Sequence, residues 1–167
     1  MSGIKVDVGT PPSGFQNYEL AEVNFHGFKN LPAARGDRTD SPEFTCLGNE
    51  WCLDVFPGGD DDSDDGMVAI GLVHKSDESI EIEYYFSIRD ATNNEVANSD
   101  FGSQLFAPKD DADGNDGWGI PNFARRSKLV KALVNGTLTV EVRMRKYDRT
   151  NEVVAHSFLK IRSAKIF

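Results

Sequence analysis

A ten-residue stretch in the middle of the chain, residues 80–89, most constrains what the chain can fold into. Apolar residues occupy every second position and mostly polar residues lie between them: Ile80, Ile82, Tyr84, Phe86 and Ile88 against Glu81, Glu83, Ser87 and Arg89. Side chains alternate between the two faces of a β-strand, so this pattern predicts a strand with one buried face and one face in water. The buried face requires a second layer to cover it.

Similar apolar runs recur at short intervals along the chain. They predict further strands at residues 15–28 (with an irregularity), 43–47, 50–56, 67–74, 95–98 and 138–145, and residues 101–107 and 153–161 are additional candidates. Residues 32–42 are expected to form a loop, and only residues 124–131, with Leu129 and Leu133 spaced for one face, favour a short helical segment. Seven or eight strands with almost no helix indicate an all-β fold, an antiparallel β-sandwich, and argue against a parallel α/β enzyme.

Two glycine-containing pairs mark predicted turns. Gly48-Asn49 separates two strands of a hairpin, and Asn135-Gly136 precedes the strand at 138–145. Asn135-Gly136-Thr137 also matches a glycosylation sequon, but the turn explains it without a sugar. Cys46 and Cys52 lie on either side of the first turn. Because the chain shows no secretory signal, we expect reduced, buried thiols, with a disulfide as the alternative.

The net charge of −9 is concentrated in two aspartate-rich segments, residues 60–65 and 110–116. These segments hold nine aspartates, and without them the remaining 18 acidic residues equal the 18 lysines and arginines. No large basic face remains to displace phosphate counterions, which disfavours a nucleic-acid partner. No apolar run is long enough for a membrane helix. We therefore expect a cytoplasmic or nuclear protein without a membrane partner.

The chain length of 167 residues fits one domain with its own core. Residues 1–14 end in a Pro- and Gly-containing run and are predicted to be a leader or linker. The remaining residues, 15–167, form the predicted sandwich domain, with a C-terminal extension beyond about residue 146.

A glycine- and aromatic-rich stretch, residues 117–123, follows the second acidic segment. Two glycines flank Trp118, and Pro121 pushes Ile120 toward an extended conformation. We interpret this stretch as a stiff corner that presents Trp118 and Ile120, either to plug the core or to wall a binding groove.

The acidic segments raise an alternative function, a calcium- or carbohydrate-binding sandwich. Asp111, Asp113, Asn115 and Asp116 offer closely spaced oxygens of the kind that calcium prefers. Counted from Asp111, however, the sixth position is Asp116 rather than Gly, which fails the EF-hand pattern, and residues 60–65 are expected to form a solvated, mobile loop.

No known catalytic motif is present, and His26, His74 and His156 lie scattered in different segments. We assign no catalytic residue, no metal and no cofactor.

The ordered landmarks resemble those of the MATH (meprin and TRAF homology) domain. They are Phe44, the Trp51-Cys52-Leu53-Asp54-Val55-Phe56-Pro57-Gly58 segment, Tyr85-Phe86-Ser87-Ile88, Trp118-Gly119 followed by Phe123, and Leu138-Thr139-Val140-Glu141-Val142. The resemblance runs from about residue 15 to 144. It implies an eight-stranded TRAF-like sandwich that binds short extended peptide segments of other proteins, sometimes as the substrate-recognition part of a cullin-based ubiquitin ligase adaptor. Homo-oligomerisation through further domains stays open.

The resemblance also implies a groove, by similarity to the substrate-binding domain of the speckle-type POZ branch of the family. The implied peptide-binding residues are Tyr84, Phe106, Asp116, Gly117, Trp118, Gly119 and Ile120, with Phe106 as a replacement aromatic. This chain departs from that branch where Gly71 replaces a groove tyrosine, Ile120 replaces an aromatic and Asp116-Gly117 replaces Lys-Asp. We therefore expect a wider groove of reversed local charge, with ligands that carry basic residues.

Overall fold

The computed structural model describes residues 17–99 and 102–147. The leader predicted at 1–14, the loop at 148–151 and the strand at 153–161 lie outside the described residues. The elements are β1 (Glu19–Phe25), the 3-10 helix η1 (Phe28–Asn30), β2 (Thr39–Asp40), β3 (Phe44–Cys46), β4 (Asn49–Phe56), β5 (Met67–His74), β6 (Ile80–Arg89), β7 (Glu95–Asn98), β8 (Gly102–Phe106), β9 (Gly117–Arg125), α1 (Arg126–Ala132) and β10 (Leu138–Lys146).

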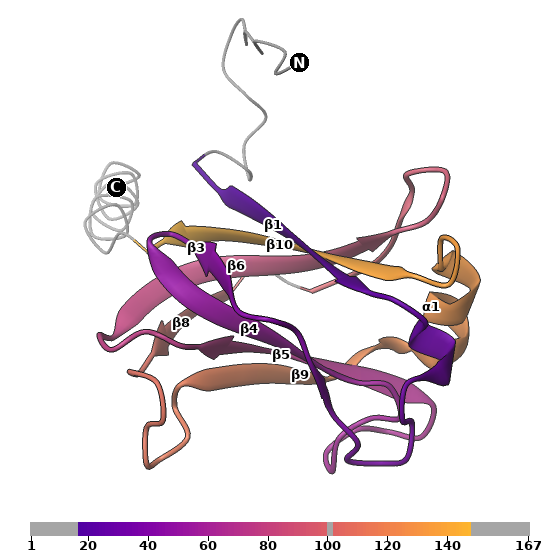
Figure 1. The fold of residues 1–167 in the computed structure, drawn as a ribbon, viewed down its shortest axis with the longest axis horizontal. Helices are drawn as coiled ribbons and strands as arrows, with labels where there is room; N and C mark the ends of the chain where they lie inside the picture. Colours follow the sequence, from indigo (N-terminus) through magenta and orange to yellow (C-terminus); the bar gives the residue numbers. More distant parts are fainter. Residues whose placement is uncertain (1–16, 100–101, 148–167) are drawn as a thin grey trace, which may run out of the picture.

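The described strands form two antiparallel sheets that face each other (Figure 1). Sheet A has the order β1-β10-β6-β7, and β8 also pairs with β6. Sheet B has the order β2-β4-β5-β9, and β3 also pairs with β4. The predicted all-β antiparallel sandwich is confirmed. The short strand β2 lies within residues 32–42, where a loop was expected; it pairs with β4, and Ser41 N–H donates to Leu53 O beside it.

The strand β6 begins and ends where the alternation predicts, and so do β5 and β7. Ile82, Phe86 and Ile88 are 0–1% exposed on the core face. The outer face of β6 is less exposed to solvent than predicted, because Ser87 is also fully buried. Its hydroxyl donates to Glu141 and accepts from Arg143, both on β10, so paired charged side chains cover it.

The β3–β4 hairpin turns one residue earlier than predicted. Leu47 and Gly48 have φ of 53° and 68°, and Cys46 pairs with Asn49. Positive φ at both central residues is typical of the two-residue turn that matches strand twist. The turn at Asn135-Gly136 is confirmed, with φ of 51° and 75°.

Both cysteines are free and buried. Cys46 Sγ lies 3.5 Å from Glu19 Oε2, and Cys52 Sγ lies 2.9 Å from Ser41 O. Burial, followed by the hydrogen bond to Glu19, raises the pKa of the Cys46 thiol to about 12. Each thiol therefore donates to an oxygen of its own surroundings, in keeping with the reduced state expected from the sequence.

The predicted corner at 117–123 is wrong, because this stretch lies within strand β9 and its first four residues pair regularly with β5. Neither Gly117 nor Gly119 has positive φ. Gly119 instead lies opposite Gly71 of β5, and a Cβ at Gly119 would lie 3.4 Å from Ile70 O. The glycines thus permit close strand packing rather than a turn.

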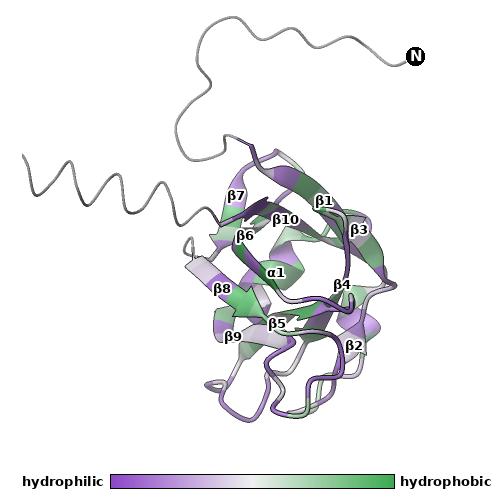
Figure 2. Ribbon diagram, turned by 90° about the vertical axis from the view of Figure 1, so that its left-hand side faces the viewer, coloured by the Kyte–Doolittle hydropathy of each residue, from purple (hydrophilic) through white to green (hydrophobic). Residues whose placement is uncertain are grey.

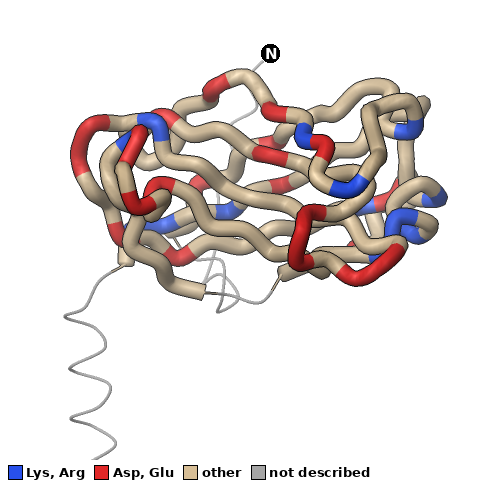
Figure 3. The backbone as a smooth tube through the Cα atoms, turned by 90° about the horizontal axis from the view of Figure 1, so that it is seen from below, with Lys and Arg blue, Asp and Glu red and all other residues tan. Residues whose placement is uncertain are grey.

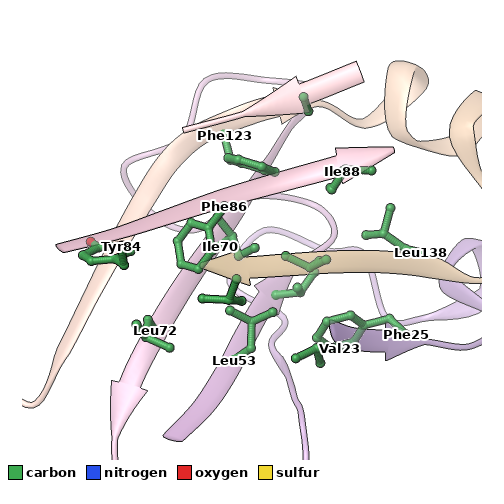
Figure 4. Packing of buried hydrophobic residues seen from close by; sticks show 14 of the residues in the cluster. Val23, Phe25, Leu53, Ile70, Leu72, Tyr84, Phe86, Ile88, Phe123 and Leu138 are labelled. Atoms are coloured by element: carbon green, nitrogen blue, oxygen red, sulfur yellow. The ribbon is translucent and has the colours of Figure 1, made fainter. Parts of the chain in front are cut away.

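The core fills the space between the sheets (Figure 4). Its largest fully buried aromatic side chains are Trp51, Phe28, Phe86 and Phe106. Hydrophobic and hydrophilic segments alternate along the strands, whereas the loops are mainly hydrophilic (Figure 2). The short helix α1 closes one end and buries Leu129. Within the described residues, neither helical segment has the length and apolarity required to cross a membrane.

Candidate functional site

A pocket of about 430 Å³ opens along one side of the sandwich, between the edge strand β9 of sheet B and the strands β6, β7 and β8 of sheet A. It is lined by Tyr84, Asn98, Ser99, Gly102, Gln104, Gly119, Ile120, Asn122 and Phe123. None of these lining residues carries a formal charge at neutral pH. The pocket therefore suits a neutral group with both apolar and hydrogen-bonding parts.

Tyr84 forms the floor of this pocket. It lies on β6 opposite Gly102 of β8, and its ring centroid is 5.3 Å from that of Phe86 (Figure 4). The Tyr84 ring also packs against Phe106, at a centroid distance of 5.9 Å. The residue is only 8% exposed, and burial raises the pKa of its phenol. Within the part of the chain that the structure describes, its hydroxyl makes no hydrogen bond. No buried side-chain oxygen or nitrogen among the described residues lacks a partner, so this hydroxyl is reached by solvent from the pocket, where a hydrogen-bonding ligand can replace water.

The strand β9 forms the opposite wall. Ile120 lies across from Ile70, a core residue of β5, so its side chain is on the face of sheet B that looks into the sandwich. The neighbouring Gly119 is exposed and leaves its backbone open to an approaching chain. An edge strand with open backbone beside an apolar side chain is the arrangement that accepts an added peptide strand.

A bulge reshapes β9 beyond Ile120. Val68 pairs with Ala124 and Ile70 pairs with Ile120, so Ala69 alone faces residues 121–123. The extra residues turn Phe123 inward, where it is 8% exposed and lies 6.2 Å from the ring of Phe86. The bulge thereby supplies the apolar end of the pocket.

Three of the seven sequence-predicted peptide-binding residues, Tyr84, Gly119 and Ile120, line the pocket together. Trp118 lies next to it, 37% exposed, and its indole Nε1–H donates to Leu105 O at 3.1 Å. This bond ties the edge of sheet B to β8 of sheet A. Trp118 therefore braces the open side of the sandwich beside the pocket.

The other predicted residues lie elsewhere. Phe106 is fully buried, with its ring 5.2 Å from that of Trp51, so its side chain contributes to the core rather than to the groove surface. Gly117 pairs with Val73 at the start of β9. Asp116 is half-buried and lies outside the pocket lining; its carboxylate accepts the Asp110 N–H. Asp116 therefore contributes no charge to the lining of the pocket.

The two acidic loops lie toward opposite ends of the sandwich, and basic residues gather near α1 (Figure 3). In the loop before β9, Asp111 accepts hydrogen bonds from the backbone and side chain of Asn115. Across residues 17–99 and 102–147, no three His, Cys, Asp or Glu side chains are placed to hold a metal ion. The carboxylates of this loop stabilise its own backbone.

The sequence pattern missed the residues that come from β7 and β8. Ser99, which directly follows β7, and Gln104 of β8 reach the pocket because β7 pairs with residues 87–89 of β6 and β8 pairs with residues 80–84. Ser99 Oγ accepts the Phe86 N–H, which fixes its place on the floor. Asn122 and Phe123 belong to the stretch at residues 117–123. Their closeness in sequence to Trp118 could have predicted that they line the site.

Comparisons with known proteins agree with this architecture. A family model described as MATH domain matches residues 23–144. Among solved structures, TRAF5 of Notothenia coriiceps is similar, with a TM-score of 0.53 and 16% sequence identity over 80% of this chain and 75% of that chain. At this identity the likeness shows the fold. No curated protein matches the chain in sequence.

Proposed function

The chain belongs to the MATH domain family, and we propose that it binds extended peptide segments of partner proteins along β9, with one ligand side chain in the Tyr84 pocket. MATH domains are in general non-catalytic protein-interaction modules. The observation that carries the proposal is the pocket itself, because it joins an open sheet edge to the Tyr84 hydroxyl, which makes no hydrogen bond within the described residues.

Peptide binding at this edge follows from the physics of sheets. A peptide that pairs with β9 gains backbone hydrogen bonds, which give affinity independent of its sequence. Alternate peptide side chains then point toward the pocket, whose neutral lining selects among them. A charged ligand side chain would lose hydration there without gaining an opposite charge. Basic ligand residues fit better beside Asp116, outside the pocket.

A peptide array followed by calorimetric titration of the selected peptides tests the proposal. Ile120→Arg places a charge in the wall and should abolish binding. Leu20→Arg, at an exposed position of the edge strand β1 on sheet A, is the matched control and should bind normally. Wild-type protein that selects no peptide, or equal binding by both variants, would contradict the proposal.

Tyr84→Phe is a finer probe, because it removes only the hydroxyl. Loss of one hydrogen bond to a ligand should weaken affinity about fivefold to tenfold, with little change in melting temperature. Unchanged affinity for every selected peptide would show that the hydroxyl is not used.

Family membership supports a second step of the proposal, in which the module is the substrate-recognition part of a cullin-based ubiquitin ligase adaptor in the cytoplasm or nucleus. The test is cullin capture from cells by the full-length protein that contains this chain. Its failure would remove the adaptor role without affecting peptide binding.

A further inference from the structure

We infer that the acidic loop at residues 59–66 sets the geometry of the peptide pocket, with Ser63 as its positioning residue. This inference rests on the proposed function, because it concerns the same pocket. The loop joins β4 to β5 and is far in sequence from the strand that it holds. It was expected to be solvated and mobile, but hydrogen bonds fasten it to the bulge of β9.

Ser63 makes the direct connection to β9. Ser63 is 7% exposed, and its hydroxyl oxygen lies 2.5 Å from Pro121 O and 2.8 Å from Asp60 Oδ1, so its one hydrogen has an acceptor in the strand, the nearer of the two, and another in the loop. The same oxygen accepts the Asp60 N–H at 3.0 Å, so loop and strand share one hydroxyl. Pro121 lies between Ile120 and Asn122, both of which line the pocket. A shift of the Pro121 carbonyl would therefore move two lining residues.

A second connection lies one residue further on. Asp64 N–H donates to Asn122 Oδ1 at 2.8 Å, and Asn122 Nδ2 donates back to the Asp64 carboxylate at 3.3 Å. The Asn122 amide is thereby oriented before any ligand arrives. Asp64 thus bonds to the Asn122 side chain through both its backbone N–H and its carboxylate. These two hydrogen bonds hold the bulge of β9 in one conformation.

Arg35 holds the loop from the other side. Its guanidinium donates to Ser63 O at 2.6 Å and to Asp60 O at 2.9 Å, and it pairs with the Asp65 carboxylate at 2.7 Å. Five aspartates in six positions repel each other, and this one guanidinium offsets part of that repulsion. The Arg35 contacts keep Ser63 at the distance from which it can reach Pro121.

The bulge needs such support because β5 supplies only Ala69 opposite residues 121–123. Pro121 has no N–H to donate, so strand pairing alone fixes its position weakly. The groups that fix it come from the loop. Ser63 is thus outside the pocket lining, yet it determines where Ile120 and Asn122 stand.

The experiment compares Ser63→Ala with Asp62→Asn, a control at an exposed position in the same loop. Amide chemical shifts are measured for Gly119, Ile120 and Phe123, together with affinity for the peptides selected by wild type. Ser63→Ala should shift these amides and weaken affinity about tenfold, the size expected from a lost hydrogen bond. Asp62→Asn should leave both unchanged.

Several outcomes would overturn the inference. One is a Ser63→Ala protein that melts lower but keeps wild-type pocket shifts and affinity, because its role would then be structural only. If Ser63→Ala does not fold, Arg35→Lys serves instead. It keeps the charge but loses the planar group whose Nη1 reaches two carbonyls while Nη2 reaches the Asp65 carboxylate, and unchanged pocket shifts would refute the coupling. If wild type selects no peptide, the proposed function fails while the chemical shifts still decide this inference.

Discussion

Replacing Asp54 by Asn should stabilise the protein at neutral pH. Asp54 lies on β4 directly opposite Asp40 of β2, and it is only 9% exposed. Burial first, and the charge of Asp40 second, raise the pKa of the Asp54 carboxyl from its ordinary 3.8 to about 6. The guanidinium of Arg38, 3.9 Å away, offsets only part of this effect. At neutral pH Asp54 is therefore ionised, although its surroundings in the folded protein favour the protonated carboxyl.

The sign follows from proton linkage. Because the folded state binds the proton more tightly than the unfolded state, the favourable contribution of Asp54 is complete below about pH 3.8 and is lost as pH rises through 6. A difference of about two pH units corresponds to roughly 3 kcal/mol, an upper bound because Asn also loses the attraction of Arg38. We expect Asp54→Asn to gain about 1–3 kcal/mol at pH 7.5 and almost nothing at pH 4.

Urea unfolding of wild type and Asp54→Asn at pH 4, 6 and 7.5 measures this difference. Asp62→Asn removes an exposed charge and serves as the control, with a change below about 0.5 kcal/mol at each pH. A destabilised Asp54→Asn protein at pH 7.5 would refute the reasoning, because it would mean that the ionised carboxylate has stabilising partners that outweigh its burial. A gain of equal size at every pH would show that the effect is packing rather than ionisation.

Three further predictions concern stability. Trp118→Ala should cost about 2 kcal/mol in denaturant unfolding, less than a fully buried tryptophan, because the residue is 37% exposed; a loss under 0.5 kcal/mol would rule out its bracing role. Gly58→Ala should cost on the order of 3 kcal/mol in the same assay, since its Cβ would lie 2.0 Å from Ala33 O, and wild-type stability would refute that contact. For Glu141, burial acts to raise the pKa, but the hydrogen bond and charge of Arg143 lower it overall from its ordinary 4.5. Glu141→Gln should therefore destabilise the fold above pH 4.5, and the deficit should shrink below that pH and vanish once the pH has fallen through the lowered pKa of the folded state. A pH-independent deficit in thermal melting would contradict this.

The regular strands could be predicted because their pattern follows from their surroundings. Apolar and mostly polar residues alternate in residues 80–89 because one face of β6 packs on the core, which requires every second side chain to be apolar. The stretch at 117–123 misled for a physical reason. Glycine and proline favour turns, but an edge strand tolerates both, because one side of its backbone has no strand partner.

The site could be predicted only in part. Tyr84 and Ile120 were identified through the family resemblance and do line the pocket. Gln104 was not, because it reaches the pocket through the pairing of β8 with β6, which no local pattern specifies. The bond from Ser63 to Pro121 joins residues 58 positions apart, so the aspartates around Ser63 indicated solvent exposure and nothing of the strand beside it.

The bulge at residues 121–123 also bears on self-association. An open strand edge can recruit a neighbouring copy and grow into an aggregate. In β9 the regular edge runs only from Gly117 to Ile120, about 13 Å at the usual rise per residue. Beyond it, Pro121 has no N–H to offer and the backbone bends away from a straight partner. The bulge that shapes the pocket thus limits the part of β9 that can pair with another strand. This part is long enough for a short peptide but too short for stable pairing with a second copy of the sheet.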